Sequence, residues 1–214
     1  MPKQEVLKPA DLVVALALAV RGETAAMTYA GLGQALGLSS STTHEAVRRL
    51  QAAGLLRPGT REPNAHALRD FVVYGVRHAF PPVLGREVQG VPTAHAGPIF
   101  RDVIDSSMPI VWPDAHGPVR GTGLTPLYPQ ATRLPERAPQ VYELLTLVDA
   151  LRVGRARERR VAVEALEKLL GVKGVPAAAG LPGETDISQM QDAEYRRRVM
   201  DELAAEAQKH GLGY

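Results

Sequence analysis

Apolar residues in the first sixty positions recur at the spacing of short helices, and glycines separate these helices. Pro9 suits the first turn of a helix, which we expect to end before Gly22. The apolar positions that share one face of this helix are Leu12, Val13, Leu16 and Val20. The pattern predicts an N-terminal helix that buries one face.

Two further helices follow at close intervals. Thr28 is suited to cap the start of the first, and Gly37 to end it in the left-handed conformation. Ser39 or Ser40 is suited to cap the second, which ends at Gly54. The residues expected to point inward from this helix are Val47 and Leu50, with Thr43 or Ala46. Two short helices joined by a glycine-containing turn form a helix-turn-helix unit.

A short extended piece, 55–57, precedes the turn dipeptide Pro58-Gly59. A winged helix-turn-helix would continue with a second strand. Here Pro63 and Asn64 begin a new helix at once, so we expect an abbreviated wing.

The stretch 36–56 resembles the winged helix-turn-helix transcriptional regulators of bacteria, MarR-like in the broad sense. The similarity rests on the "LGLS" turn, the Ser/Thr-rich helix start, the "RRL" and the "AAGLL" exit, and it extends over about residues 9–60. It implies that the second helix of the unit enters the major groove of duplex DNA, with the N-terminal residues of that helix facing bases and phosphates.

Helical spacing places small and polar side chains on the exposed stripe of this helix, and arginines flank the wing turn. Hydroxyl side chains allow close approach to DNA, and the helix N-terminus favours a phosphate. Glu45 places a negative charge within the same helix, which weakens the attraction of phosphates. The candidate DNA-binding residues are Thr28, Ser40, Ser41, His44, Arg48, Arg57 and Arg61.

The middle of the chain, 63–130, is rich in proline, glycine and histidine. Asn64 is suited to cap a helix that runs to Ala79. A helix is expected around 99–104, and short extended pieces are expected at 109–113 and 119–127. This mixture favours a compact, irregular effector or partner-binding module, in which Trp112 and Tyr128 belong to the core or line a pocket.

Two amphipathic helices between 135 and 170 carry broad apolar faces. These faces suit either core packing or a dimer interface. The stretch 152–160 between them holds five arginines and one glutamate. Arg152, Arg155 and Arg157 are therefore candidates for a second contact with DNA or an acidic partner, and a solvated basic surface is the alternative.

Composition narrows the function classes. The formal net charge is +2, which excludes a polycationic binder, and the absence of cysteine excludes disulfides and thiolate metal sites. The histidines lack metal-ligand spacing, and Gly121-Thr122-Gly123 lacks the lysine of a P-loop. We predict no enzyme, no metal and no cofactor. The longest apolar run, Leu12–Val20, has nine residues and is too short to span a bilayer, so we expect a cytoplasmic protein.

The sequence thus predicts a mainly α fold with a few short strands (α+β). Residues 1–62 form a winged helix-turn-helix domain, 63–170 an effector, partner-binding or dimerisation domain, and 171–214 a linker and a C-terminal helix. We expect a sequence-specific regulator that binds double-stranded DNA as a homodimer and senses a ligand or a protein partner. One alternative is a DNA-binding antitoxin that neutralises a partner protein, and another is a small metal-dependent enzyme.

Overall fold

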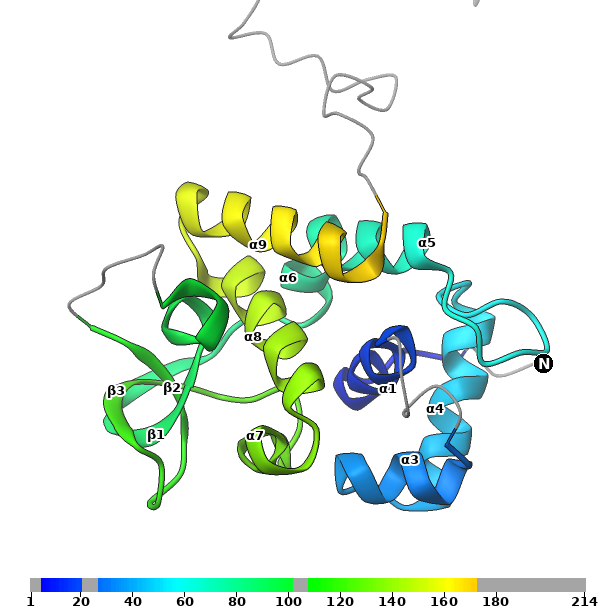
Figure 1. Ribbon diagram of the computed structural model, residues 1–214, viewed down its shortest axis with the longest axis horizontal. Helices are drawn as coiled ribbons and strands as arrows, with labels where there is room; N and C mark the ends of the chain where they lie inside the picture. The colour runs from blue at the N-terminus through cyan, green and yellow to red at the C-terminus, as the bar shows by residue number, and fades with distance from the viewer. Residues whose placement is uncertain (1–4, 21–26, 102–107, 173–214) are drawn as a thin grey trace, which may run out of the picture. The chain divides into compact units, whose positions relative to one another are not determined.

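The computed structural model describes residues 5–20, 27–101 and 108–172. The chain divides into a first unit, Met1–Gly174, and a second, Val175–Tyr214, and the expected C-terminal helix lies outside the described residues. The described part is mostly helical with one small sheet, as predicted (Figure 1). Among the described residues, none of the helices combines the length and the apolar character that a membrane span requires.

Two helices form the centre of the first unit. α1 (Pro9–Ala19) packs against α3 (Tyr29–Leu36), α4 (Ser40–Ala52) and α8 (Pro139–Val153) (Figure 1). The prediction that α1 buries a single face is wrong, because every residue from Asp11 to Leu18 is buried. A helix enclosed by neighbours on several sides needs apolar residues all round.

α8 is enclosed in the same way, with every residue from Leu144 to Arg152 buried. It contacts α1, α6 (Val76–Ala79), α7 (Leu134–Arg137) and α9 (Ala156–Leu170). Core packing therefore accounts for the leucines of α8, and they offer no surface to a second copy of the chain.

Asn64 caps the start of α5 (Ala65–Asp70), because its side chain accepts a hydrogen bond from the backbone N–H of Ala67 (3.3 Å). A single π-helical turn, η1 (Phe71–Gly75), connects α5 to α6, so the helix predicted between Asn64 and Ala79 is confirmed with this one irregularity. α5 packs against α9, and Arg69 donates two hydrogen bonds to Glu167 across that contact (3.0 and 2.6 Å).

Three strands form a small closed sheet, and two of them lie within the extended pieces predicted at 109–113 and 119–127. β1 (Leu84–Thr93) pairs antiparallel with β2 (Ile110–Pro113) and with β3 (Val119–Leu124), and β2 and β3 are parallel. Two 3-10 turns, η2 (Ala94–Ala96) and η3 (Pro98–Phe100), join the sheet to α8, and a third, η4 (Ala131–Arg133), precedes α7. Of the helix expected at 99–104, residues 102–104 lie outside the described ranges.

A buried polar group fastens the sheet to α8. Oδ2 of Asp149 accepts hydrogen bonds from Thr93 of β1 (2.8 Å) and from the indole N–H of Trp112 of β2 (2.7 Å). Its other oxygen accepts from Arg152 (2.6 Å). Burial raises the pKa of the Asp149 carboxyl, against the opposing effects of Arg152 and the two neutral donors. Trp112 and Tyr128 are both buried in the core.

Candidate nucleic-acid interface

The turn between α3 and α4 is tightly packed. Gly37 ends α3 at a φ of +68°, a conformation that favours glycine. A Cβ atom on Gly33 would lie 2.7 Å from the carbonyl oxygen of Leu38 and 2.9 Å from the hydroxyl of Thr43. Glycine at position 33 therefore allows α3 to approach the start of α4, a requirement that sequence reasoning missed.

The first turn of α4 is capped by hydroxyl side chains. Ser39 accepts a hydrogen bond from the backbone N–H of Thr42 (3.1 Å), which confirms the predicted cap. Thr43 is buried and donates its hydroxyl hydrogen to the carbonyl of Ser39 (2.9 Å). At the start of α3, Thr28 likewise accepts from the N–H of Gly31 (3.1 Å).

One face of α4 is buried and the other is exposed. The inward residues are Thr43, Ala46, Val47, Arg49 and Leu50. All four residues predicted on the outward stripe are exposed, namely Ser40, Ser41, His44 and Arg48. The structure thus brings them together along one surface of α4.

A buried ion pair fixes α4 to α1. Arg49 donates from Nε and Nη2 to the two carboxylate oxygens of Asp11, both at 2.7 Å. Asp11 also accepts from the backbone N–H of Lys8 (2.8 Å) at the start of α1. The hydrogen bonds to Asp11 raise the pKa of Arg49, so this guanidinium stays charged. Because both partners are buried, Arg49 is a structural residue within the "RRL" segment.

Tyr29 of α3 contacts both His44 of α4 and Arg61, which follows the wing turn. The ring of Tyr29 in α3 meets the His44 ring edge-on, with 5.1 Å between their centroids. The guanidinium carbon of Arg61 lies over the same Tyr29 ring, 5.3 Å from its centroid, and Nη1 of Arg61 donates to the carbonyl of Met27. Arg61 therefore turns back towards α3. Tyr29, which the sequence patterns did not single out, joins it to the exposed stripe.

The wing is as short as predicted. A single bridge pairs Leu56 with Pro63, and the N–H of Arg57 donates to the carbonyl of Glu62 (2.9 Å). The side chain of Gln51 at the end of α4 donates to the carbonyl of Thr60 (2.5 Å). The wing tip is therefore held against α4 and not extended from it.

Two exposed arginines of this surface form ion pairs with nearby acidic residues. Arg48 pairs with Glu5 at 2.8 Å, and Arg57 with Glu62 at 3.5 Å. Glu45 lies 3.5 Å from the buried Arg49. Glu5 and Glu62 thus neutralise the two cations that a phosphate group would otherwise attract.

The prediction of a second anionic contact is wrong for one of its three arginines. Arg152 cannot contact an outside anion, because it is buried against Asp149 and also donates to the carbonyls of Phe80 (2.9 Å) and Pro81 (3.2 Å). Arg155 and Arg157 are exposed near the start of α9. Figure 1 shows that end of α9 well apart from α4, so these arginines do not belong to the same surface.

The described residues include no group of three or more His, Asp or Glu side chains that could hold a metal ion. His66, His78 and His116 are exposed, and His95 approaches Glu158 at 4.0 Å. The structure does not gather these histidines at one site.

Residues 22–57 match the model of a protein family described as winged helix-turn-helix DNA-binding. This segment, which includes α3, α4 and the first residues of the wing, is a winged helix-turn-helix DNA-binding domain. No curated protein and no solved structure shows significant similarity to the chain.

Proposed function

We propose that the protein is a sequence-specific regulator of transcription that binds duplex DNA through α4. The observation that carries this proposal is the exposed stripe of Ser40, Ser41, His44 and Arg48 on the second helix of a helix-turn-helix DNA-binding domain. Short hydroxyl side chains at the start of α4 let its backbone approach phosphates, while His44 and Arg48 reach towards base edges. The likeness to MarR-like regulators supports the same role.

The proposal includes a homodimer. Proteins of this type read two half-sites that lie one helical turn of DNA apart, so two copies of α4 are needed for a symmetric site. The region from α5 to α9 then senses a ligand or partner and has no catalytic function. Sedimentation of the full chain, free and with DNA, tests the dimer: we expect two copies on each bound duplex, and one copy would contradict it.

Selection from a random duplex library tests DNA recognition directly. The full-length protein should enrich a defined motif, and its Kd for that motif should be on the order of a thousandfold lower than for scrambled DNA at the same salt concentration. A salt series then counts the phosphate contacts from the slope of log Kd. No enrichment of any motif would contradict sequence-specific binding.

A further inference from the structure

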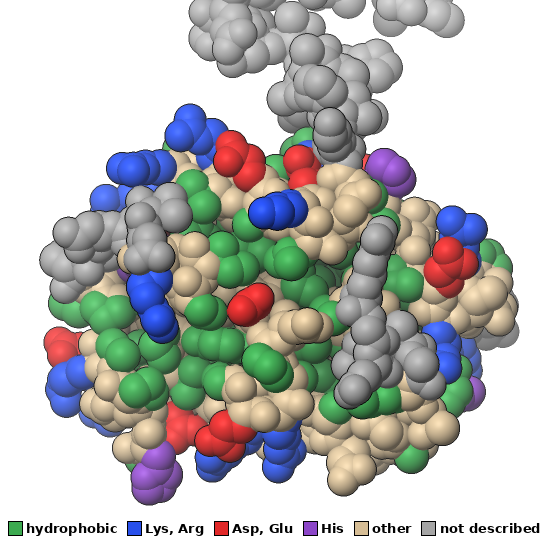
Figure 2. All heavy atoms as spheres, in the orientation of Figure 1, with side chains coloured by type: hydrophobic (Ala, Val, Ile, Leu, Met, Phe, Trp, Pro, Cys, Tyr) green, Lys and Arg blue, Asp and Glu red, His purple; other side chains and the backbone are tan. Residues whose placement is uncertain are grey.

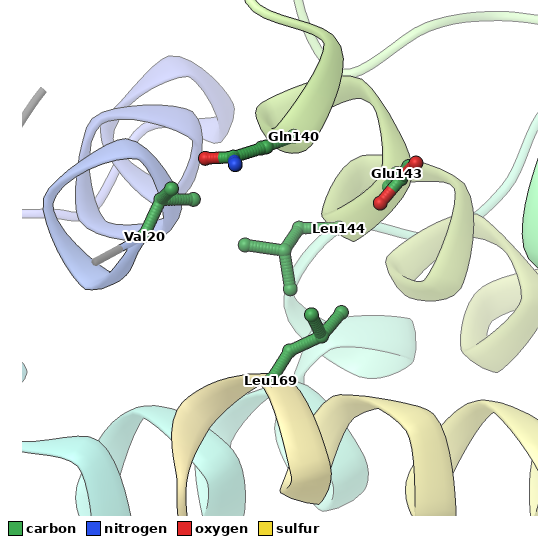
Figure 3. A pocket seen from close by; sticks show the side chains of 5 residues that line it. All are labelled: Val20, Gln140, Glu143, Leu144 and Leu169. Atoms are coloured by element: carbon green, nitrogen blue, oxygen red, sulfur yellow. The ribbon is translucent and has the colours of Figure 1, made fainter. Parts of the chain in front are cut away.

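A pocket of about 220 Å³ lies where the ends of three helices meet. It is lined by Val20 at the end of α1, Leu169 near the end of α9, and three residues of the first turns of α8, namely Gln140, Glu143 and Leu144. Figure 3 shows Val20, Leu144 and Leu169 directed into the same space, with the amide of Gln140 turned towards α1. Ligand pockets for drug-sized molecules have volumes of about 300–1,000 Å³, so this one suits a smaller molecule.

The lining combines one carboxylate with an apolar surface. Glu143 is half-buried and forms no hydrogen bond or ion pair through its carboxylate with the described part of the chain. Leu169 of α9 remains 42% exposed, although Ala162, Leu166 and Leu170 of the same helix are buried in the core. In Figure 2, hydrophobic side chains gather in the middle of the face shown, and an acidic side chain lies among them.

These features define the chemistry of a ligand. A carboxylate beside apolar side chains favours a cation, since the charge-assisted hydrogen bond is stronger where water is partly excluded. The apolar walls favour a hydrocarbon body, and the amide of Gln140 offers one further polar partner. We propose that this pocket binds a small primary amine, whose ammonium group pairs with Glu143 and whose apolar part packs between Val20, Leu144 and Leu169.

The pocket is connected to the DNA-binding helix by α1. Val20 follows the last turn of α1, and Asp11 in its first turn holds Arg49 of α4. α1 has 11 residues, so a rigid element about 16 Å long joins the two ends. A ligand that shifts Val20 therefore acts on the position of α4 through the Asp11–Arg49 pair. This effector role rests on the proposed DNA binding, whereas the site itself does not.

Methyl NMR titration of the full-length protein tests the site, with n-hexylamine as the probe and n-hexanol and hexanoate as its neutral and anionic counterparts. We expect hexylamine at pH 7 to shift the methyl signals of Val20, Leu144 and Leu169 and to bind about tenfold more tightly than hexanol. Glu143→Gln should remove that difference. Glu164→Gln, the same change at an exposed position of α9 outside the pocket, should leave it intact.

Equal affinity for hexylamine and hexanol, or an unchanged preference in Glu143→Gln, would overturn the proposed site. The effector role is tested by the Kd for the selected duplex with and without hexylamine. We expect a change in the native protein, none in Glu143→Gln, and the reciprocal change in the Kd for hexylamine when the duplex is present. An unchanged Kd for the duplex would overturn the effector role. Failure of DNA binding itself would appear in the absence of any probe, and the NMR titration would still decide the site.

Discussion

Arg49 of α4 and Asp11 of α1 form a buried, two-point ion pair in which both N–O distances are 2.7 Å. The two residues are 38 positions apart, so the pair couples the N-terminal helix to the helix that carries the candidate DNA-binding stripe. Removal of one member of such a pair is costly, because the remaining charge stays buried without a partner.

We therefore predict that Asp11→Asn lowers the free energy of unfolding by about 3–5 kcal/mol. Urea denaturation followed by circular dichroism measures this loss. Glu45→Gln is the matched control, because Glu45 is the exposed and more distant partner of Arg49, and it should cost less than about 1 kcal/mol. Equal losses for the two variants would contradict the structural role of the pair.

Arg152 and Arg155 are close in sequence and differ in role. Arg152→Ala should destabilise the fold by about 3–5 kcal/mol, because it leaves Asp149 buried without its cation and frees the carbonyls of Phe80 and Pro81. Arg155→Ala, at an exposed position, should change stability by no more than about 0.5 kcal/mol. Thermal unfolding of both variants decides the matter, and a stable Arg152→Ala protein would refute the buried assignment.

Local features of this chain could be predicted from sequence patterns. These features depend on neighbours within four residues, and the structure confirms each of them. They are the helix caps at Thr28, Ser39 and Asn64, the glycine at 37 and the outward stripe of α4. The short wing was predictable for the same reason, because Pro63 and Asn64 set its length locally.

Features that depend on distant parts of the chain were not predictable. The burial of α1 on all sides requires α8, and the role of Arg152 requires the carbonyls at positions 80 and 81. Tyr29 matters only because folding brings Arg61 to it. Periodicity gives the face on which a residue lies, but it does not identify the residue that the face will meet.

The buried Tyr128 and the half-buried Tyr142 predict a stability loss at alkaline pH. Burial raises the pKa of Tyr142 to about 12 and raises that of Tyr128 as well. Because the unfolded chain ionises near pH 10, the contribution of these phenols is complete below about pH 10 and is lost as pH rises towards about 12. The Tm should fall steeply in this window.

Absorbance at 295 nm offers the matching spectroscopic measurement. In the folded protein, Tyr128 and Tyr142 should ionise only at a higher pH than an exposed tyrosine. Tyr142→Phe removes one of these late ionisations and the hydrogen bond to the carbonyl of Pro92 (2.7 Å). This variant should begin about 1 kcal/mol less stable but lose less stability from pH 10 to 12. An unchanged slope would contradict the prediction.

Glu5 should limit the affinity for DNA. It pairs with Arg48 at 2.8 Å, and 62% of the Arg48 side chain is exposed, so the arginine must leave Glu5 to meet a base or a phosphate. Glu5→Gln should tighten binding to the selected duplex by about two- to fivefold at low salt. Fluorescence anisotropy measures this change, with Glu87→Gln of β1 as the control, which removes an acid from the exposed pair with Arg120. Weaker binding by Glu5→Gln would contradict the competition.

In the proposed mode of binding, the exposed stripe of α4 reads DNA. The Kd values of Arg48→Ala and His44→Ala for the selected duplex at one fixed salt concentration test this role, with Arg86→Ala as a control at an exposed position of β1. We predict that each α4 variant binds the selected duplex about tenfold or more weakly, with a smaller loss on scrambled DNA, and that Arg86→Ala binds normally. Unchanged affinity in both α4 variants would contradict the claim.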